Sequence, residues 1–222
     1  MLLLCLSDIH GEGAGIPSIL AACAGLEAVV LVGDLTHLGG EDEAARVVDP
    51  LLAAGLRVLA VPGNMDRPGV LSFLERRGLS LHGRGVTIGD VGFFGLGGSN
   101  PTPFRTPFEV PGDEARALLE AAWPSVSAAR CRVLVSHAPP RGTRIDRSIA
   151  RLHVGSAEVR SFLESHDVDL CLSGHIHEAA GEDTVGATRC VNLGAFKNGR
   201  HALVSIEPGE DRSGITITWR NQ

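Results

Sequence analysis

Three stretches in the first third of the sequence decide the fold: LLLCLSDIH (residues 2–10), AVVLVGD (28–34) and RVLAVPGN (57–64). Each opens with a short apolar run and closes with polar residues. Between these stretches, residues 16–24 and 42–54 place apolar side chains at helical spacing. Short buried strands that alternate with helices are typical of a parallel sheet, so we predict a βαβαβ unit with strands at Leu2–Leu6, Ala28–Val32 and Arg57–Val61.

The remaining apolar runs follow a different order and predict that the sheet becomes mixed. After a helix expected at 70–77, runs at 86–88 and Val91–Leu96 flank Gly89-Asp90, a pair typical of a hairpin turn. The pattern continues with helices at 113–123 and 156–166 and strands at Cys131–Ser136, 169–172, 188–193, 201–206 and 215–219. We therefore predict an α/β fold in which two mixed β-sheets pack as a β-sandwich flanked by α-helices.

Two long segments lack any periodic pattern. Residues 97–111 (GGSNPTPFRTPFEVP) contain four prolines, and residues 138–155 carry four arginines. We predict that both are loops. Loops of this length in compact domains are usually functional or disordered.

The length and composition are those of one globular domain. The 222 residues exceed an average domain of about 150 but fall short of two, so residues 1–222 are expected to form a single domain. Hydrophobic residues make up 44% and charged residues 21%, which excludes a disordered or coiled-coil chain. A net charge of −6 and the scarcity of aromatic residues argue against a binder of nucleic acid polymers.

Cysteine use and the apolar pattern bear on location. The five cysteines are odd in number and widely spaced, and Cys5, Cys131 and Cys171 lie in or beside apolar runs, as expected of reduced core thiols. The apolar start lacks the basic residues of a signal peptide, and no apolar run approaches the ~18 residues of a membrane span. We expect a cytoplasmic protein without a membrane partner.

The polar residues of greatest interest share one position, just beyond the carboxyl end of a predicted strand. In open α/β sheets these strand ends form the ligand crevice. A lone aspartate, asparagine or histidine after a strand is more often a turn former or a bystander, but five such loops that each deliver a metal-ligand residue type make that interpretation improbable for the set. The residues are Asp8, His10, Asp34, Asn64, His137, His175 and His177.

These residues form an ordered signature. The sequence reads Asp8-Ile9-His10, Gly33-Asp34, Gly63-Asn64-Met65-Asp66, His137 and Gly174-His175-Ile176-His177. In this order it resembles the calcineurin-like metallophosphoesterases, whose signature is D-x-H, G-D, G-N-(H)-(D/E), H and G-H-x-H. The phrases GSNPTPF (98–104), SHAPPRGT (136–143) and HVGS (153–156) look like the small prokaryotic branch of that family.

The resemblance implies a four-layer fold and a centre of two divalent metal ions such as Mn, Fe, Zn or Ni. Imidazole nitrogens with carboxylate and amide oxygens suit such ions. The implied reaction is hydrolysis of a small phosphate ester by a hydroxide that bridges the metals, with a phosphodiester such as a cyclic nucleotide favoured over a monoester. The implied ligands are Asp8, His10 and His177 for one ion, Asn64, His137 and His175 for the other, and Asp34 for both.

The sequence departs from the signature at Met65, where many family members have a histidine that assists the leaving group. Methionine cannot donate a proton. Either the substrates have good leaving groups or another donor substitutes, and His37 is the first candidate. We therefore expect Asp34, Asn64 and His37 as catalytic residues and Asn64 and Arg141 as substrate contacts, while the role of Asp66 stays open.

Two functions of different classes remain open. The first is a metal-dependent phosphoric ester hydrolase, and the second is a catalytically weak scaffold that keeps the fold for protein–protein binding. The complete ligand set favours the enzyme, and only Met65 favours the scaffold. The sequence leaves a homo-oligomer open, and it predicts structural or exposed positions for the histidines outside the motifs, His82, His166 and His201.

Overall fold

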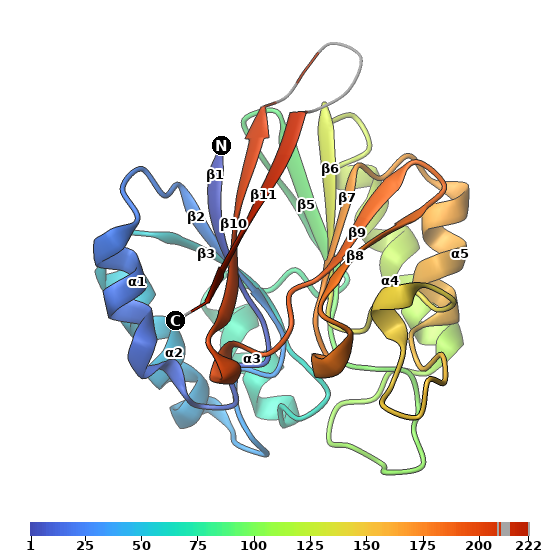
Figure 1. Cartoon of the computed structure of the whole chain (residues 1–222), viewed down its shortest axis with the longest axis horizontal. Helices are drawn as coiled ribbons and strands as arrows, with labels where there is room; N and C mark the ends of the chain where they lie inside the picture. Colours follow the sequence, from blue (N-terminus) through green and yellow to red (C-terminus); the bar gives the residue numbers. More distant parts are fainter. Residues whose placement is uncertain (208, 210–213, 222) are drawn as a thin grey trace.

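Two mixed β-sheets pack face to face, and helices cover their outer faces, as Figure 1 shows. This computed structural model describes residues 1–207, 209 and 214–221. In the described part of the chain, the first sheet has the strand order β11-β10-β1-β2-β3. Strands β1 to β3 run parallel, while β10 and β11 are antiparallel to their neighbours. Their bounds are Leu2–Leu6 (β1), Ala28–Val32 (β2), Arg57–Val61 (β3), Arg200–Glu207 (β10) and Gly214–Asn221 (β11).

The second sheet has the strand order β4-β5-β6-β7-β9-β8. Its inner strands run parallel, and the edge strands β4 and β8 are antiparallel to their neighbours. Their bounds are Gly85–Ile88 (β4), Val91–Leu96 (β5), Cys131–Ser136 (β6), Leu170–Ser173 (β7), Gly181–Val185 (β8) and Thr188–Asn192 (β9).

Helices cover each sheet on the side away from the other sheet (Figure 1). Helices α1 (Ile16–Ala22), α2 (Glu41–Ala53) and α3 (Pro68–Arg76) cover the first sheet, and α4 (Gly112–Ala122) and α5 (Ala157–Ser165) cover the second. Short 3-10 turns lie at Gly13–Gly15 (η1), Trp123–Ser125 (η2), Arg144–Asp146 (η3), His177–Ala179 (η4) and Phe196–Asn198 (η5).

The core forms three apolar layers because successive strand residues point to opposite faces of a sheet. In β1, Leu3 and Cys5 join the layer between the sheets, whereas Leu4 and Leu6 join the layer beneath α1 to α3. Both faces of the strand are therefore buried. This explains why the parallel strands appear in the sequence as continuous apolar runs without alternation.

The predicted fold class is confirmed: the layers are helix, sheet, sheet and helix. Residues 89–90 join β4 and β5 in the expected hairpin. The segments 97–111 and 138–155 contain isolated bridges and one 3-10 turn in place of regular strands or helices. Residues 181–185 form β8, a strand that the sequence pattern does not predict.

The burial of the cysteines and the length of the helices can be compared with the sequence-based expectations. Of the five cysteines, all except Cys23 are buried. Among the described residues, every helix is too short or too polar to cross a bilayer.

Candidate metal centre

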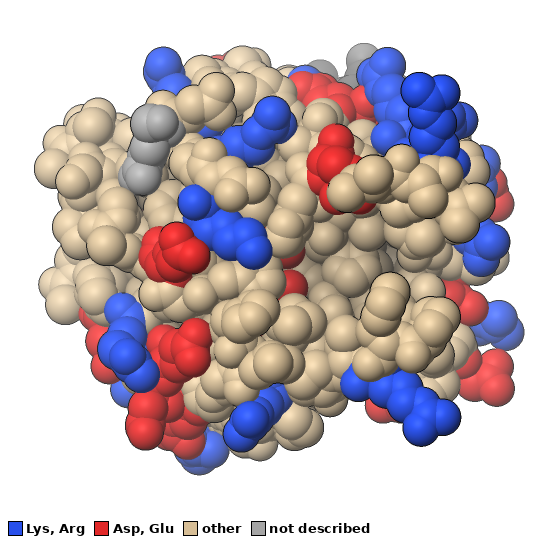
Figure 2. Space-filling model, turned by 60° about the horizontal axis from the view of Figure 1, so that its bottom comes forward, with Lys and Arg blue, Asp and Glu red and all other residues tan. Residues whose placement is uncertain are grey.

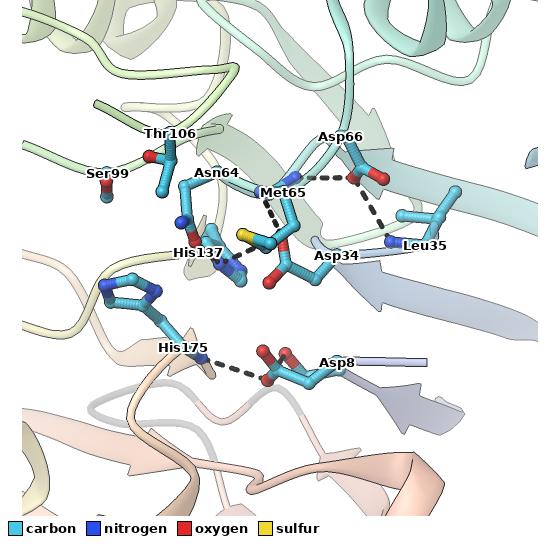
Figure 3. Close-up of polar contacts among 12 residues, drawn as sticks. Asp8, Asp34, Leu35, Asn64, Met65, Asp66, Ser99, Thr106, His137 and His175 are labelled. Carbon is cyan, nitrogen blue, oxygen red and sulfur yellow. Dashed lines mark hydrogen bonds and ion pairs between the residues drawn. The ribbon is translucent and has the colours of Figure 1, made fainter. Parts of the chain in front are cut away.

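Loops from both sheets converge at one end of the sandwich, where the parallel strands end (Figure 3). A parallel sheet places the carboxyl ends of its strands at one edge, so residues distant in sequence meet there. Asp8 and His177 are 169 positions apart, and their side chains lie 3.0 Å from each other. The first sheet contributes Asp8, His10, Asp34 and Asn64, and the second contributes His137, His175 and His177.

Asp8, His10 and His177 form one cluster whose ligand atoms all lie within 4.8 Å of one another. Asp8 is fully buried. Its Oδ2 accepts hydrogen bonds from the Ser7 hydroxyl at 2.7 Å and from the backbone N–H of His175 at 3.0 Å. These bonds fix the carboxylate and direct Oδ1 toward His177, so the cluster is held in place from both sheets.

Asp8, Asp34 and His137 form a second cluster within the same 4.8 Å limit. The Nδ1 atom of His137 lies 2.8 Å from the carbonyl oxygen of Val32, which can only accept, so Nδ1 donates, and in the neutral ring Nε2 has a lone pair for a metal ion. Such a hydrogen bond on the far nitrogen is usual for a metal-ligating histidine. The His137 Nε2 atom lies 3.1 Å from Asn64 Oδ1, and the His175 ring is centred 5.0 Å from the His137 ring.

Asp34 lies between the two clusters. Its Oδ2 is 3.7 Å from His10 Nε2, and its Oδ1 is 3.5 Å from His137 Nε2. The backbone N–H of Met65 donates to Oδ1 at 2.8 Å and holds the carboxylate in this position. One carboxylate is thus shared by histidines from the two sheets.

An unpartnered nitrogen shows that this site suits a cation. The Nε2 atom of His10 is buried and has no hydrogen-bond partner among the described residues. A buried polar atom without a partner is costly unless a ligand satisfies it. Its neighbour Asp34 is also buried, and a metal ion between them would satisfy both.

Burial sets the protonation of the site. Burial raises the pKa of Asp34 to about 7, and it lowers the pKa of His10 to about 4 and that of His175 to about 3. Burial alone would raise the pKa of Asp8, but the hydrogen bond with His177, the charges of His137 and His177 and the Ser7 hydroxyl together lower it to about 2. His10 and His175 are therefore neutral at pH 7 and keep the lone pairs that metal ligands need.

The backbone is strained at the candidate ligands. Asp8 (φ 53°), His10 (φ 50°), Asp34 (φ 50°) and His175 (φ 67°) adopt left-handed conformations. Such conformations cost about 1 kcal/mol or more for residues with a side chain, and they cluster at functional sites. The chain keeps these conformations because its loops must direct several side chains to one point.

Two motif glycines are required by close approach. A Cβ at Gly63 would overlap the backbone and carboxylate of Asp34, and a Cβ at Gly174 would overlap Ser7 and Asp8. The G-N and G-H dipeptides therefore bring neighbouring loops closer together than any side chain would allow.

The carboxylate of Asp66 joins two of these loops, which answers the question that the sequence left open. Its Oδ1 accepts from the N–H and the hydroxyl of Thr36, both at 2.8 Å, and its Oδ2 accepts from Gly63 N–H at 2.8 Å and Leu35 N–H at 3.1 Å. All four bonds are internal to the loops after β2 and β3. Asp66 is therefore a brace between the loops that carry Asp34 and Asn64.

The remaining predicted residues lie at the rim. Figure 3 shows the Met65 thioether directed into the site beside Asn64 and His137. His37 is exposed, and its Nδ1 lies 3.4 Å from the Nδ1 of His10. The Arg141 side chain is exposed and makes no hydrogen bond or ion pair with the described residues.

Sequence reasoning missed two residues that position the site. Ser7 fixes Asp8, and the Asn192 amide donates to the carbonyls of Ile145 at 3.0 Å and Ile176 at 2.8 Å. Asn192 thereby ties the loop of His175 and His177 to the segment 138–155. It ends β9, so the strand-end rule that found the ligands would have selected it as well.

Comparison with known proteins identifies the family. The sequence model of the calcineurin-like phosphoesterases matches residues 1–179, and the chain belongs to this family of metal-dependent phosphoester hydrolases. The uncharacterised protein MJ1162 of Methanocaldococcus jannaschii is 34% identical over 196 residues, which cover 84% of this chain and 85% of that protein.

Solved structures share the fold. TT1561 of Thermus thermophilus superposes with a TM-score of 0.77 at 20% identity and covers 99% of this chain and 98% of its own. A dimetal phosphatase from Danio rerio superposes with a TM-score of 0.67 at 15% identity and covers 100% of this chain and 96% of its own.

Proposed function

We propose that this chain hydrolyses phosphate esters with two divalent metal ions and prefers phosphodiesters such as cyclic nucleotides. The observation that carries the proposal is the position of Asp34, with one oxygen 3.7 Å from His10 Nε2 and the other 3.5 Å from His137 Nε2. A carboxylate between two imidazoles can serve two ions at once. The zebrafish protein that shares this fold is named a dimetal phosphatase, which supports the same interpretation.

The seven residues divide into two ligand sets around the shared carboxylate. We propose Asp8, His10 and His177 for one ion, and Asn64, His137 and His175 for the other. Two divalent ions held there would attract a phosphate ester and lower the pKa of a water between them. The nitrogen and oxygen ligands support Mn, Fe, Zn or Ni. Asn64 suits its place because a neutral amide binds a cation without cancelling its charge.

The charge balance supports a diester. Among the described residues, no arginine side chain donates to any of the seven proposed ligands, and Lys197 is a basic side chain whose charge acts on one of them, His10. A monoester carries an additional charged oxygen, which would call for a further cationic donor. A diester carries one negative charge and requires fewer donors. Arg141 is the proposed additional contact to the organic part of the substrate.

His37 is the proposed proton donor to the leaving group. Its Nδ1 is next to His10, so its other ring nitrogen remains available toward solvent. The residue lies in the loop after β2, which also carries Asp34. Met65 offers no proton from the position that faces the site.

The proposal includes the setting in which the enzyme acts. We propose that residues 1–222 form one domain, and that this domain works in the cytoplasm. The thiols of Cys5, Cys171 and Cys190, which are buried in the core and form no disulfide, support a reducing compartment.

A substrate panel with controlled metal content tests the proposal. The protein is stripped of metal, reloaded separately with Mn, Fe, Zn, Ni or Mg, and given phosphomonoesters, diesters and cyclic nucleotides. We expect hydrolysis only after loading, two ions per chain and the highest rates with diesters. Two bound ions without turnover on any ester would favour the protein-binding scaffold, which the methionine at position 65 would suit.

A further inference from the structure

The most exposed large apolar side chains of the described residues lie in two loops beside the candidate metal centre. Phe104 (86% exposed) belongs to the loop after β5, and Ile149 (86%) and Leu152 (64%) belong to the loop after β6. At these exposures the side chains project into solvent and cannot line a pocket. Figure 1 shows both loops projecting beyond the sheets at the end where β5 and β6 stop, at the lower right.

Internal hydrogen bonds hold the first loop in shape. Glu109 accepts from the hydroxyls of Thr102 at 2.7 Å and Thr106 at 2.9 Å, on either side of Phe104. The backbone N–H of Phe108 donates to the carbonyl of Asn64 at 3.1 Å, which ties this loop to the metal centre. Phe104 is therefore displayed on an ordered support.

The second loop is held in the same way. The backbone N–H of Ile149 donates to Glu178 at 2.7 Å, and that residue directly follows His177. The backbone N–H of Ser148 donates to the carbonyl of Leu152 at 3.0 Å, which closes a tight turn. Ile149 and Leu152 thus project from one turn that is anchored beside a proposed metal ligand.

Basic side chains accompany these apolar ones. Arg105 follows Phe104, while Arg147 and Arg151 flank Ile149, and all three arginines are exposed. Their side chains make no ion pair or hydrogen bond with the described residues. The acids nearest to these arginines in sequence, Glu109 and Asp146, already accept hydrogen bonds from loop donors. Figure 2 views this end of the molecule and shows uncharged lobes on the right with basic and acidic side chains at their margins.

We propose that the loops 97–111 and 138–155 dock this protein on an anionic lipid bilayer, with the candidate metal centre turned toward the membrane surface. Apolar side chains at loop tips can enter the boundary between headgroups and acyl chains. Arginines at the same level contact lipid phosphates, and each contributes about fivefold to affinity for an anionic surface. The sequence predicted no membrane partner from the absence of a spanning segment, and surface docking requires none.

The charge of the loops favours lipid over two other partners. In a symmetric dimer built on this face, the same arginines would meet across the two-fold axis and repel. A nucleic acid would pair with the arginines, but it offers no apolar layer for Ile149 and Leu152.

Vesicle sedimentation of the purified, metal-loaded full chain tests the docking. The probes are vesicles of phosphatidylcholine alone and of phosphatidylcholine with phosphatidylglycerol at about 3:1. We expect sedimentation with the anionic vesicles only, weakening as salt is raised because the charges are exposed. Sedimentation does not depend on turnover, so its result is independent of whether the protein hydrolyses phosphate esters.

Paired variants separate the two contributions. Phe104→Ser with Ile149→Ser and Leu152→Ser should abolish sedimentation, and Arg147→Gln with Arg151→Gln should weaken it about 25-fold. The matched controls are Val86→Ser with Trp219→Ser, on strands β4 and β11, and Arg57→Gln with Arg130→Gln, at the opposite ends of the sheets. All changes are on the surface, and circular dichroism checks that each variant folds.

Several results would overturn the proposal. Equal sedimentation with neutral and anionic vesicles would remove the role of the arginines, and equal loss in the control variants would remove the role of these loops. Absence of vesicle binding at low salt would refute docking outright. A dimer that dissociates in the Phe104, Ile149 and Leu152 variant, or duplex DNA binding in place of vesicle binding, would assign the face to another partner.

Discussion

The carboxylate of Asp34 lies between a histidine of the first sheet and a histidine of the second. Replacing Asp34 therefore tests the assignment of two metal ions most directly. Asp34→Asn keeps the shape and removes the charge. We expect the variant to lose at least one of the two ions and its activity to fall by about three orders of magnitude or more, because the charge shared between the cations is gone. Metal content is measured by mass spectrometry and activity on the best ester of the panel.

The control for Asp34→Asn is the same substitution at a surface aspartate. Asp49→Asn removes a carboxylate that pairs with Arg77 at 2.8 Å far from the site, and it should leave metal content and rate unchanged. Wild-type turnover with two ions in Asp34→Asn would show that the dinuclear assignment is wrong.

The two histidines of the G-H-x-H motif separate the half-sites. The His177 ring is next to Asp8 and His10, whereas the His175 ring is next to His137. His177→Ala should therefore deplete the ion assigned to Asp8 and His10, and His175→Ala should deplete the other. Anomalous scattering from crystals of each variant measures the occupancy of each position. Depletion of the same ion in both variants would contradict the division.

Met65 predicts how the rate depends on the leaving group. Its thioether offers no proton to a departing alkoxide, and a general acid typically contributes about 10² to 10⁴ in rate. Met65 alone predicts that esters of ordinary alcohols react far more slowly than nitrophenyl esters, and a proton supplied by His37 would reduce this difference. Met65→His should accelerate the poor leaving groups, by an amount at the low end of that range, because Asp66 already accepts four bonds and has no capacity left to orient the new ring.

The variant His37→Ala tests whether His37 donates the proton to the leaving group. A weak dependence on the leaving group in the unmodified protein, lost in His37→Ala, would show that His37 supplies the proton. A steep dependence that His37→Ala leaves unchanged would limit His37 to its contact with His10.

The sequence predicted those residues of the site that directly follow a strand. Each candidate ligand follows a strand, and position after a strand can be recognised in sequence. Ser7, Asp66 and Asn192 contact backbone groups in distant segments of the chain, and nothing local in the sequence specifies those partners. Their roles required the coordinates.

At the scale of elements, the buried strands were predictable and the edge strand β8 was not. The sequence of β8 is GEDTV, in which Glu182 and Asp183 interrupt any apolar pattern. Charged residues are common on edge strands because they prevent pairing with another chain. Glu182 binds Arg189 of β9 at 2.7 Å, so this strand is held mainly by its pairing and charges, and Val185 is its one buried residue.

Asp66, which braces the loops after β2 and β3, can be tested by substitution. In Asp66→Asn, an amide N–H₂ would replace one oxygen and oppose backbone N–H donors that now bond to it. Loss of these buried charge-assisted bonds should lower the free energy of unfolding by about 3 kcal/mol and weaken metal binding, since both loops carry ligands. Urea unfolding and metal titration measure the two effects.

Thr36→Val supplies the graded comparison. It removes only the hydroxyl that donates to Asp66 at 2.8 Å and keeps the three backbone donors, so we expect a loss of about 1 kcal/mol. If Asp66→Asn proved as mild as Thr36→Val, the carboxylate would not be the brace between these loops.

At the scale of the whole molecule, the segment after α3 connects the two sheets at their edges. Ser80 forms a bridge with Ala60 of β3, and His82 forms a bridge with Gly95 of β5. The Leu81 N–H donates to Ala60 at 2.8 Å, and the Gly83 N–H donates to Gly95 at 2.9 Å. We call this connection, residues 80–83, the seam between the sheets. The sequence could not reveal it, because residues 80–83 bond to backbone groups in strands from different sheets.

His82 makes the seam sensitive to acid. Its Nδ1 accepts the Gly97 N–H at 2.9 Å, and its ring is buried against Phe108. Burial lowers its pKa to about 4, whereas an unfolded chain has the ordinary histidine value of about 6.5. Between these values the unfolded chain binds a proton that the folded chain does not. The stability that the neutral ring contributes is therefore complete above pH 6.5 and is lost as the pH falls toward 4, by up to about 3 kcal/mol.

His82→Asn isolates this contribution, because the amide oxygen of asparagine can accept the same N–H and does not titrate. We expect the free energy of unfolding of the metal-free wild type to fall more steeply between pH 6.5 and 4.5 than that of the metal-free variant. Urea unfolding at a series of pH values gives the difference between the two proteins, in which the contributions of His10, His175 and the carboxylates cancel. Parallel curves would show that protonation of His82 does not open the seam between the sheets.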